Sequence, residues 1–120
     1  MNDQLNAPAG QALNLAQFIN YADGSVVSKT LLKKDTGNIT LFAFDNGQGL
    51  SEHTAPFDAL VYVLDGEGIV EVGEEKKKVE KDSIVHSPAK IVHCWSNESD
   101  KLLRIMVAKT PKPKESTILL

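Results

Sequence analysis

Short segments in which apolar and polar residues alternate run through most of the chain, and turn-forming residues separate them. Alternation with a period of two is typical of strands that bury one face. The separating stretches are rich in Gly, Asn, Asp and Pro, which favour turns. The pattern predicts strands at 26–32, 38–44, 50–53, 60–64, 69–72, 77–80, 83–87, 92–96 and 102–108. Many short strands at nearly regular spacing predict an all-β sandwich or barrel.

The two ends of the chain have a different pattern. In the stretch ALNLAQFINY, residues 12–21, the apolar positions follow a helical spacing, which predicts a short N-terminal helical segment that Asp23 and Gly24 end. Pro111 and Pro113 stop the last strand, so the tail leaves the core, and its final Ile-Leu-Leu either packs on a partner subunit or stays mobile. We therefore expect an N-terminal arm at 1–24, a β-barrel at 25–109 and a C-terminal tail at 110–120.

Length and composition limit the class of protein. A chain of 120 residues is the size of one domain and can bury a core without disulfide bonds. The single cysteine, Cys94, cannot form an intramolecular disulfide and fits a reducing compartment. The first twenty residues lack the pattern of a secretion signal, and no apolar run approaches the ~20 residues of a membrane helix. We expect a cytoplasmic protein that neither enters a membrane nor, with a net charge of -3, binds nucleic acid.

Glycines and alanines around His53 form a recognisable pattern. Gly47 stands six residues before His53, and Gly66 stands thirteen residues after it. This spacing resembles the first motif of the cupin superfamily, G(X)5HXH(X)3-4E(X)6G. In that alignment Ala55 takes the place of the second histidine, and Ala59 takes the place of the glutamate.

The second half of the chain resembles the second cupin motif, G(X)5PXG(X)2H(X)3N. Its proline falls on Pro88, its histidine on His93 and its asparagine on Asn97. Asp82 and Lys90 stand where the motif has glycines. The chain is similar to small single-domain bacterial cupins with an incomplete first motif. The resemblance implies a conical double-stranded β-helix, the cupin or jelly-roll barrel, with its histidines in the wider end, and a homodimer.

A complete cupin site holds a divalent transition metal such as Fe, Zn, Ni or Mn. Here His53 and His93 are the remaining metal candidates, with Glu52, Asp58 and His86 as weaker ones. Two neutral imidazoles are fewer than the three protein ligands that catalytic zinc sites usually keep. The resemblance therefore implies a degenerate metal site.

The same histidines could serve a barrel without a metal. An imidazole carries a proton either way near neutral pH, and a binding pocket needs only an apolar cavity with a few polar anchors. The candidate ligand-binding residues are His53, His93, Ser51 and Trp95, although Trp95 could instead pack between sheets or subunits. Three hypotheses stay open: a small-molecule-binding barrel, a metal-dependent oxygenase or isomerase with a displaced carboxylate, and a structural or regulatory module whose barrel mouth is closed.

Overall fold

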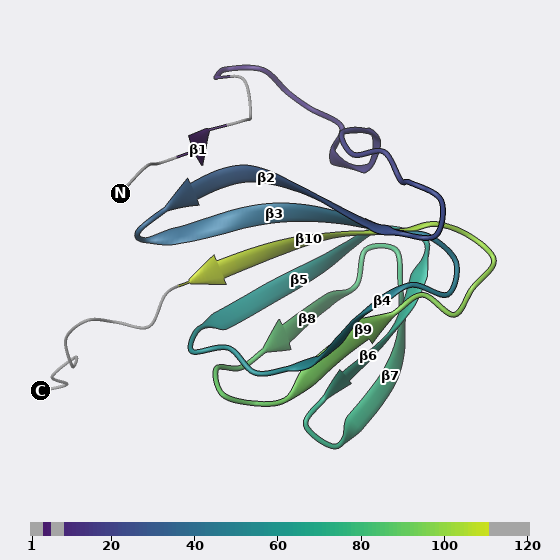
Figure 1. Cartoon of the computed structure of the whole chain (residues 1–120). Coiled ribbons are helices and arrows are strands. Elements are labelled where there is room, and N and C mark those ends of the chain that lie inside the picture. Colours follow the sequence, from purple (N-terminus) through teal and green to yellow (C-terminus); the bar gives the residue numbers. More distant parts are fainter. Residues whose placement is uncertain (1–3, 6–8, 111–120) are drawn as a thin grey trace, which may run out of the picture.

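Two antiparallel β-sheets lie face to face in the computed structural model, which describes residues 4–5 and 9–110 (Figure 1). The six-stranded sheet has the order β1-β2-β3-β10-β5-β8, and the four-stranded sheet has the order β4-β9-β6-β7. Several neighbours in each sheet, such as β3 with β10 and β4 with β9, come from distant parts of the chain, as in a double-stranded β-helix. The strands are β1 (Gln4–Leu5), β2 (Val26–Lys34), β3 (Gly37–Phe44), β4 (Gly49–His53), β5 (Asp58–Asp65), β6 (Glu67–Val72), β7 (Glu75–Glu80), β8 (Ile84–Ser87), β9 (His93–Ser96) and β10 (Leu103–Thr110).

The predicted all-β class is confirmed, and each predicted strand is present with ends that differ by a few residues. The two-residue β1, which pairs with β2, was not predicted because so short a segment has no measurable period. The expected N-terminal helix is a single 3-10 turn at Leu15–Gln17. A first helical turn is unfavourable by itself, and here the apolar residues around it pack on the sheet instead of on one another.

The main core lies between the two sheets. Because alternate side chains of each strand face inward, residues two apart on β5 and β10 are buried together. Its fully buried side chains are Phe44, Val63, Leu103 and Ile105, and Trp95 of β9 is 3% exposed. This core fills the end of the barrel near Leu103, where β3 ends and β10 begins. The opposite end of the barrel is less filled.

A second core lies on the outer face of the six-stranded sheet. The arm around the 3-10 turn lies over this face in Figure 1, and Ile19 packs there with Leu31, Leu41 and Ala43. Arg104 Nε also donates a hydrogen bond to the Ile19 carbonyl at 3.2 Å. Burial on both faces explains why the end of β3 reads as a continuous apolar run instead of an alternating one.

The turns of the two sequence motifs meet in the fold. The amide of Gly47 donates to the carbonyl of Asn97 at 2.8 Å, and the amide of Asn97 donates to the carbonyl of Gln48 at 2.8 Å. Asp82 and Lys90 have positive φ angles of 71° and 66°, and they are the non-glycine residues of the described chain with this conformation. Both occupy motif glycine positions, so the backbone keeps a left-handed turn at each although the glycine itself is absent.

Candidate functional site

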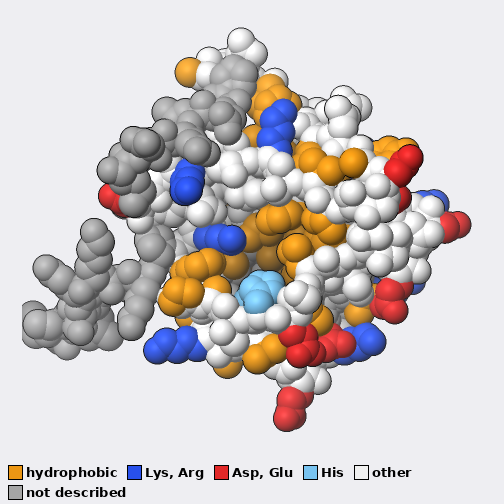
Figure 2. Space-filling view, viewed as in Figure 1, with side chains coloured by type: hydrophobic (Ala, Val, Ile, Leu, Met, Phe, Trp, Pro, Cys, Tyr) orange, Lys and Arg blue, Asp and Glu red, His pale blue; other side chains and the backbone are white. Residues whose placement is uncertain are grey.

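A cavity of about 280 Å³ opens at one end of the barrel, between the sheets. In Figure 2 apolar side chains fill the floor of this hollow, and a histidine and a basic side chain border it. No aspartate or glutamate is among its lining residues within the described chain. The lining consists of Phe42, Leu50, His53, Thr54, Ala55, Pro56, Phe57, Ala59, Val61, Ser87, His93, Trp95, Ile105, Val107 and Lys109.

His53 and His93 face each other across adjacent strands of the four-stranded sheet. They are register partners in the β4–β9 pair, and their ring centroids lie 4.1 Å apart with the ring planes at 66°. His93 is buried, at 9% exposed, whereas His53 is exposed at the mouth. A register shift between Leu50 and His53 interrupts the ladder, which lets His53 face the same side as its partner.

Backbone carbonyls orient both imidazoles. His53 Nδ1 lies 2.7 Å from the carbonyl oxygen of Ser51, and His93 Nδ1 lies 3.0 Å from that of Ile91. Because a carbonyl oxygen only accepts hydrogen bonds, Nδ1 of each ring carries a proton, and the neutral form of each ring has its lone pair on Nε2. Both Nε2 atoms are without a hydrogen bond to the described residues, so they are available to a ligand in the cavity.

The donor set in the cavity does not fit the complete metal site of the fold. Ala55 and Ala59 line the cavity where the motif has a histidine and a glutamate, and the described lining supplies no carboxylate. A divalent cation would therefore meet two neutral nitrogens, without the third protein ligand or the negative charge that usually accompany it.

Two other predicted binding residues lie at different depths. Trp95 lines the cavity and packs in the core beside it. The structure does not bring the Ser51 side chain to the cavity. Strand alternation turns the Ser51 side chain away from the cavity. Its carbonyl oxygen accepts the hydrogen bond from His53 Nδ1.

The weaker metal candidates lie outside the cavity. Asp58 Oδ1 accepts a hydrogen bond from the Ala89 amide at 2.8 Å and lies 3.7 Å from His86 Nε2, with both side chains more than half exposed. These contacts give Asp58 a role in anchoring the turn after Pro88. His86 alternates with the buried Ser87 on β8 and so lies on the outer face.

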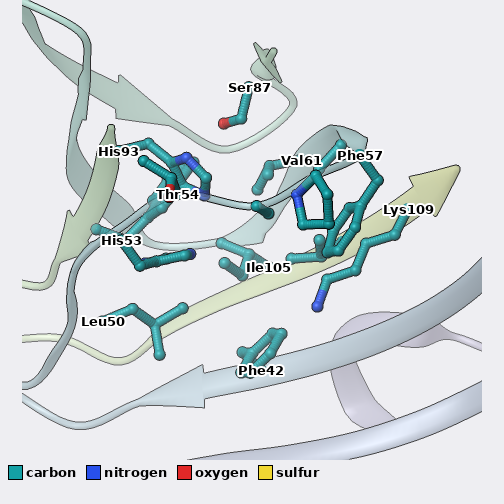
Figure 3. A pocket seen from close by; sticks show the side chains of 15 residues that line it. Phe42, Leu50, His53, Thr54, Phe57, Val61, Ser87, His93, Ile105 and Lys109 are labelled. Carbon is teal, nitrogen blue, oxygen red and sulfur yellow. The ribbon is translucent and has the colours of Figure 1, made fainter. Parts of the chain in front are cut away.

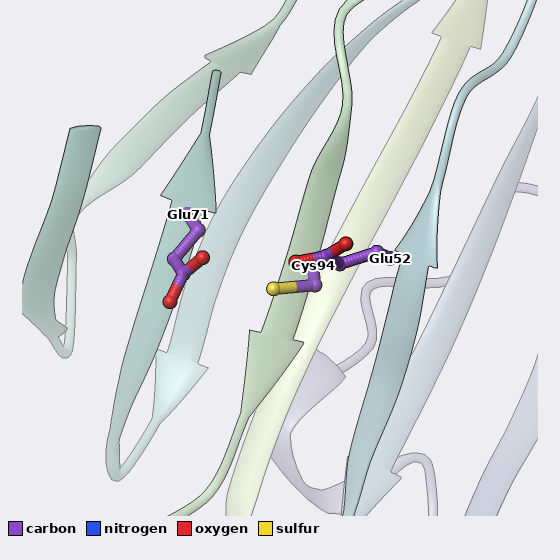
Figure 4. Close-up of side chains that lie close together, drawn as sticks. All are labelled: Glu52, Glu71 and Cys94. Atoms are coloured by element: carbon purple, nitrogen blue, oxygen red, sulfur yellow. The ribbon is translucent and has the colours of Figure 1, made fainter. Parts of the chain in front are cut away.

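Glu52 belongs to a different group of residues, shown in Figure 4. Glu52, Glu71 and Cys94 come from β4, β6 and β9, and their ligand atoms lie within 4.8 Å of one another. Cys94 stands between the inward-facing His93 and Trp95, so the group lies on the outer face of the four-stranded sheet. Burial and the nearby carboxylates of Glu71 and Glu52 raise the pKa of the Cys94 thiol, because they disfavour its anion.

Sequence reasoning missed several residues that line the cavity, above all Lys109 and Ser87. A signal for Lys109 was present, because it continues the inward positions Ile105 and Val107 at a spacing of two. Ser87 is 1% exposed, and its Oγ has no hydrogen-bond partner among the residues that the structure describes. A serine beside a motif proline is ordinary in a turn, so its burial could be known only from the pairing of β8 with β5.

The paired sheets, with a cavity that holds one histidine from each sequence motif, define a double-stranded β-helix protein. The chain matches the family of the cupin domain, Cupin_2, over residues 40–109, and it belongs to this family. An uncharacterized protein of Streptomyces coelicolor is 29% identical over 80 residues, which are 67% of this chain and 75% of that protein.

Solved structures agree with this fold. A conserved protein of unknown function from Streptococcus pyogenes has a TM-score of 0.82 at 24% identity, with 94% of this chain and 97% of that chain covered. A cupin superfamily protein from Desulfitobacterium hafniense also has a TM-score of 0.82 at 24% identity, with 89% and 96% covered. A cupin 2 conserved barrel domain protein from Leptotrichia buccalis is 35% identical at a TM-score of 0.76, and the match covers 82% of this chain and 47% of that one.

Among the residues that the structure describes, no helix has the length and apolar character needed to cross a membrane.

Proposed function

We propose that this cupin binds a small organic molecule in its barrel, with His53 and His93 as the polar anchors. The observation that carries the proposal is the cavity of about 280 Å³, whose mostly apolar lining meets two imidazoles with free Nε2 atoms. Ligand pockets typically combine an apolar wall with a small number of oriented polar groups. The fixed Nδ1 hydrogen bonds support this function because they hold both rings ready before the ligand arrives.

The other two hypotheses have less support. A metal-dependent oxygenase or isomerase would need a carboxylate beside the histidines. Glu52 instead lies near Glu71 and Cys94, outside the cavity, and Asp58 accepts a hydrogen bond from the Ala89 amide. A closed structural module would need side chains to fill the barrel mouth, and alanines stand at two of the lining positions.

The binding function can be tested through Trp95, which is the only tryptophan of the chain and lines the cavity. We expect members of a library of small neutral and charged fragments to change its fluorescence and raise the melting temperature. The variant Ala59→Leu places extra carbon atoms in the cavity, so it should abolish these responses. The matched control is Ala108→Leu, on the outer face of the neighbouring strand β10, and it should leave them unchanged.

Two results would contradict the proposal. Either no fragment binds at millimolar concentration, or Ala59→Leu binds the same fragments as strongly as the wild type does.

A metal titration tests the enzyme hypothesis separately. We expect Co²⁺ and Zn²⁺ to bind weakly, with a stoichiometry well below one per chain after dialysis. The double variant His53→Ala, His93→Ala and the single variant Cys94→Ala distinguish the cavity from the outer Glu52–Glu71–Cys94 group. Tight stoichiometric binding that only the histidine variant abolishes would favour the metal enzyme over the proposed binding protein.

A further inference from the structure

Lys109 gives the cavity a charge that its other lining residues do not balance. It is half-buried, and its lining neighbours include no aspartate or glutamate within the described chain. Its Nζ lies 5.3 Å from the centroid of the Phe57 ring, and it forms no ion pair with any described residue. In Figure 3 the ammonium is turned toward the cavity instead of away from it. A partly desolvated cation without a counter-charge favours an anionic ligand.

The other side of the cavity offers neutral polar groups. Figure 3 places Ser87 and the two histidines on one side, and Lys109 and Phe57 on the other. Ser87 Oγ is buried, and it has no hydrogen-bond partner in the described chain. A buried hydroxyl without a partner is rare in native structures and indicates a group that a ligand or water completes. Together with the free Nε2 atoms, it can donate to and accept from a hydroxyl or oxo group.

The space between these two sides is apolar and small. Phe42, Leu50, Val61 and Ile105 line it, and the cavity volume is about 280 Å³. At roughly 30 Å³ per water in the liquid, this is room for about nine waters, or for an organic molecule of similar size. A sugar or nucleotide would bring more hydroxyl and phosphate groups than the described lining can satisfy.

We propose that the ligand is a small carboxylic acid with an apolar body and a hydroxyl or oxo group at the far end. Its carboxylate pairs with the Lys109 ammonium, its body lies against the apolar lining, and its second polar group bonds to Ser87 and His93. This inference rests on the proposed small-molecule binding and adds the chemical class of the ligand.

The test compares acids with their neutral amides, which have nearly the same shape. A panel of matched pairs, from 4-hydroxybenzoate to 4-hydroxyphenylacetate with the corresponding primary amides, is titrated at pH 7.5 by calorimetry and Trp95 fluorescence. We expect at least one acid to bind at least tenfold more tightly than its amide. Lys109→Met keeps the aliphatic stem and removes the charge, so it should erase that difference, whereas Lys109→Arg should retain part of it.

Two control variants distinguish the site from general effects. Lys29 also lies over a phenyl ring, with Nζ 3.6 Å from the centroid of Phe18, but it is outside the cavity. Lys29→Met should therefore leave the acid preference unchanged. Ser87→Ala should weaken the hydroxy acids severalfold without affecting phenylacetate, which lacks the second polar group. Because its Oγ has no partner in the described part of the chain, this substitution should not lower the melting temperature.

The outcomes distinguish the chemical class of the ligand from binding in the cavity. If amides bind as tightly as acids, or Lys109→Met binds acids as tightly as the wild type does, the anionic class is overturned while binding in the cavity stands. If neither acids nor amides bind at 10 mM, this inference is overturned, and a failed fragment library would then overturn the proposed function as well.

Discussion

The glycines of the first cupin motif, Gly47 and Gly66, both have positive φ angles, of 78° and 82°, but their surroundings differ. An added Cβ at Gly47 would meet open space, whereas at Gly66 it would collide with the carbonyl oxygen of Leu102. The motif therefore requires glycine at the first position for backbone conformation alone. At the second position it also requires glycine for the close approach of another chain segment.

This difference predicts unequal effects of the same substitution. Gly47→Ala should lower the free energy of unfolding by about 1 kcal/mol, the cost of a left-handed residue with a side chain. Gly66→Ala should lower it by at least about 3 kcal/mol, because the loop before β10 must also move. Urea denaturation of both variants provides the comparison. Equal losses would show that the contact with Leu102 relaxes freely.

Asn97 of the second motif stabilises the loop between β9 and β10. It is fully buried, and its Nδ2 donates to the carbonyls of Phe44 at 3.1 Å and Lys101 at 2.7 Å. Its Oδ1 accepts from the amide of Ser99 at 3.1 Å and from its hydroxyl at 2.8 Å. The motif asparagine is thus a structural residue, separate from the cavity.

Removal of this amide should leave several buried polar groups without partners. We expect Asn97→Ala to lower the free energy of unfolding by about 2 to 4 kcal/mol, and Ser99→Ala by about 1 kcal/mol, because the serine loses fewer bonds. Chemical denaturation measures both. An alanine at 97 that costs no more than the alanine at 99 would contradict the central role of the amide.

At the scale of elements, Asp45 connects the end of β3 to the N-terminal arm. Its carboxylate accepts from the amides of Gly24 and Asn46, at 2.8 and 2.9 Å. These hydrogen bonds hold its pKa below the ordinary value of 3.8, because they favour the anion. A depressed carboxyl pKa contributes stability above the unfolded value, and this contribution is lost as the pH falls through the folded value.

We therefore expect the stability difference between the wild type and Asp45→Asn to depend on pH. At pH 7 the wild type should be more stable, and the difference should shrink as the pH falls below the ordinary carboxyl pKa of about 4 toward the lower pKa of folded Asp45. Urea denaturation at pH 7, 4 and 3 measures it. A difference that stays constant across this range would mean that the charge on Asp45 does not matter.

The alternation of inward and outward positions along single strands predicted many of the residues that face the cavity, but not all of them. On β10, Ile105, Val107 and Lys109 share the inward face, so a period of two would have aimed the lysine at the barrel interior. On β4 the same rule, counted from the inward-facing Leu50, would aim Glu52 at the cavity. The register shift before His53 keeps Glu52 outside it, and the sequence does not mark this shift. Element periodicity therefore predicted faces well, but it did not predict local register.

At the scale of the whole molecule, the six-stranded sheet has apolar side chains exposed beyond the arm. Leu60 on β5 is 49% exposed and Ile84 on β8 is 63% exposed, on neighbouring strands. The family resemblance predicts a homodimer, and we expect light scattering to give twice the chain mass of 13.1 kDa. The double variant Leu60→Glu, Ile84→Glu should halve this mass if the dimer uses this sheet face. A wild-type monomer at 100 μM would contradict the prediction.

The sequence by itself determined the all-β class, the positions of the strands and the two motif histidines, because these depend on local periodicity and on spacing along the chain. The tertiary structure decided what surrounds those histidines. Pairing of distant strands placed His53 beside His93 and brought Ser87 and Lys109 to the cavity wall. It left Asp58 bonded to the Ala89 amide and Glu52 near Glu71 and Cys94, both outside the cavity. A ligand site depends on which segments meet in space, and a pattern read along one strand does not contain that information.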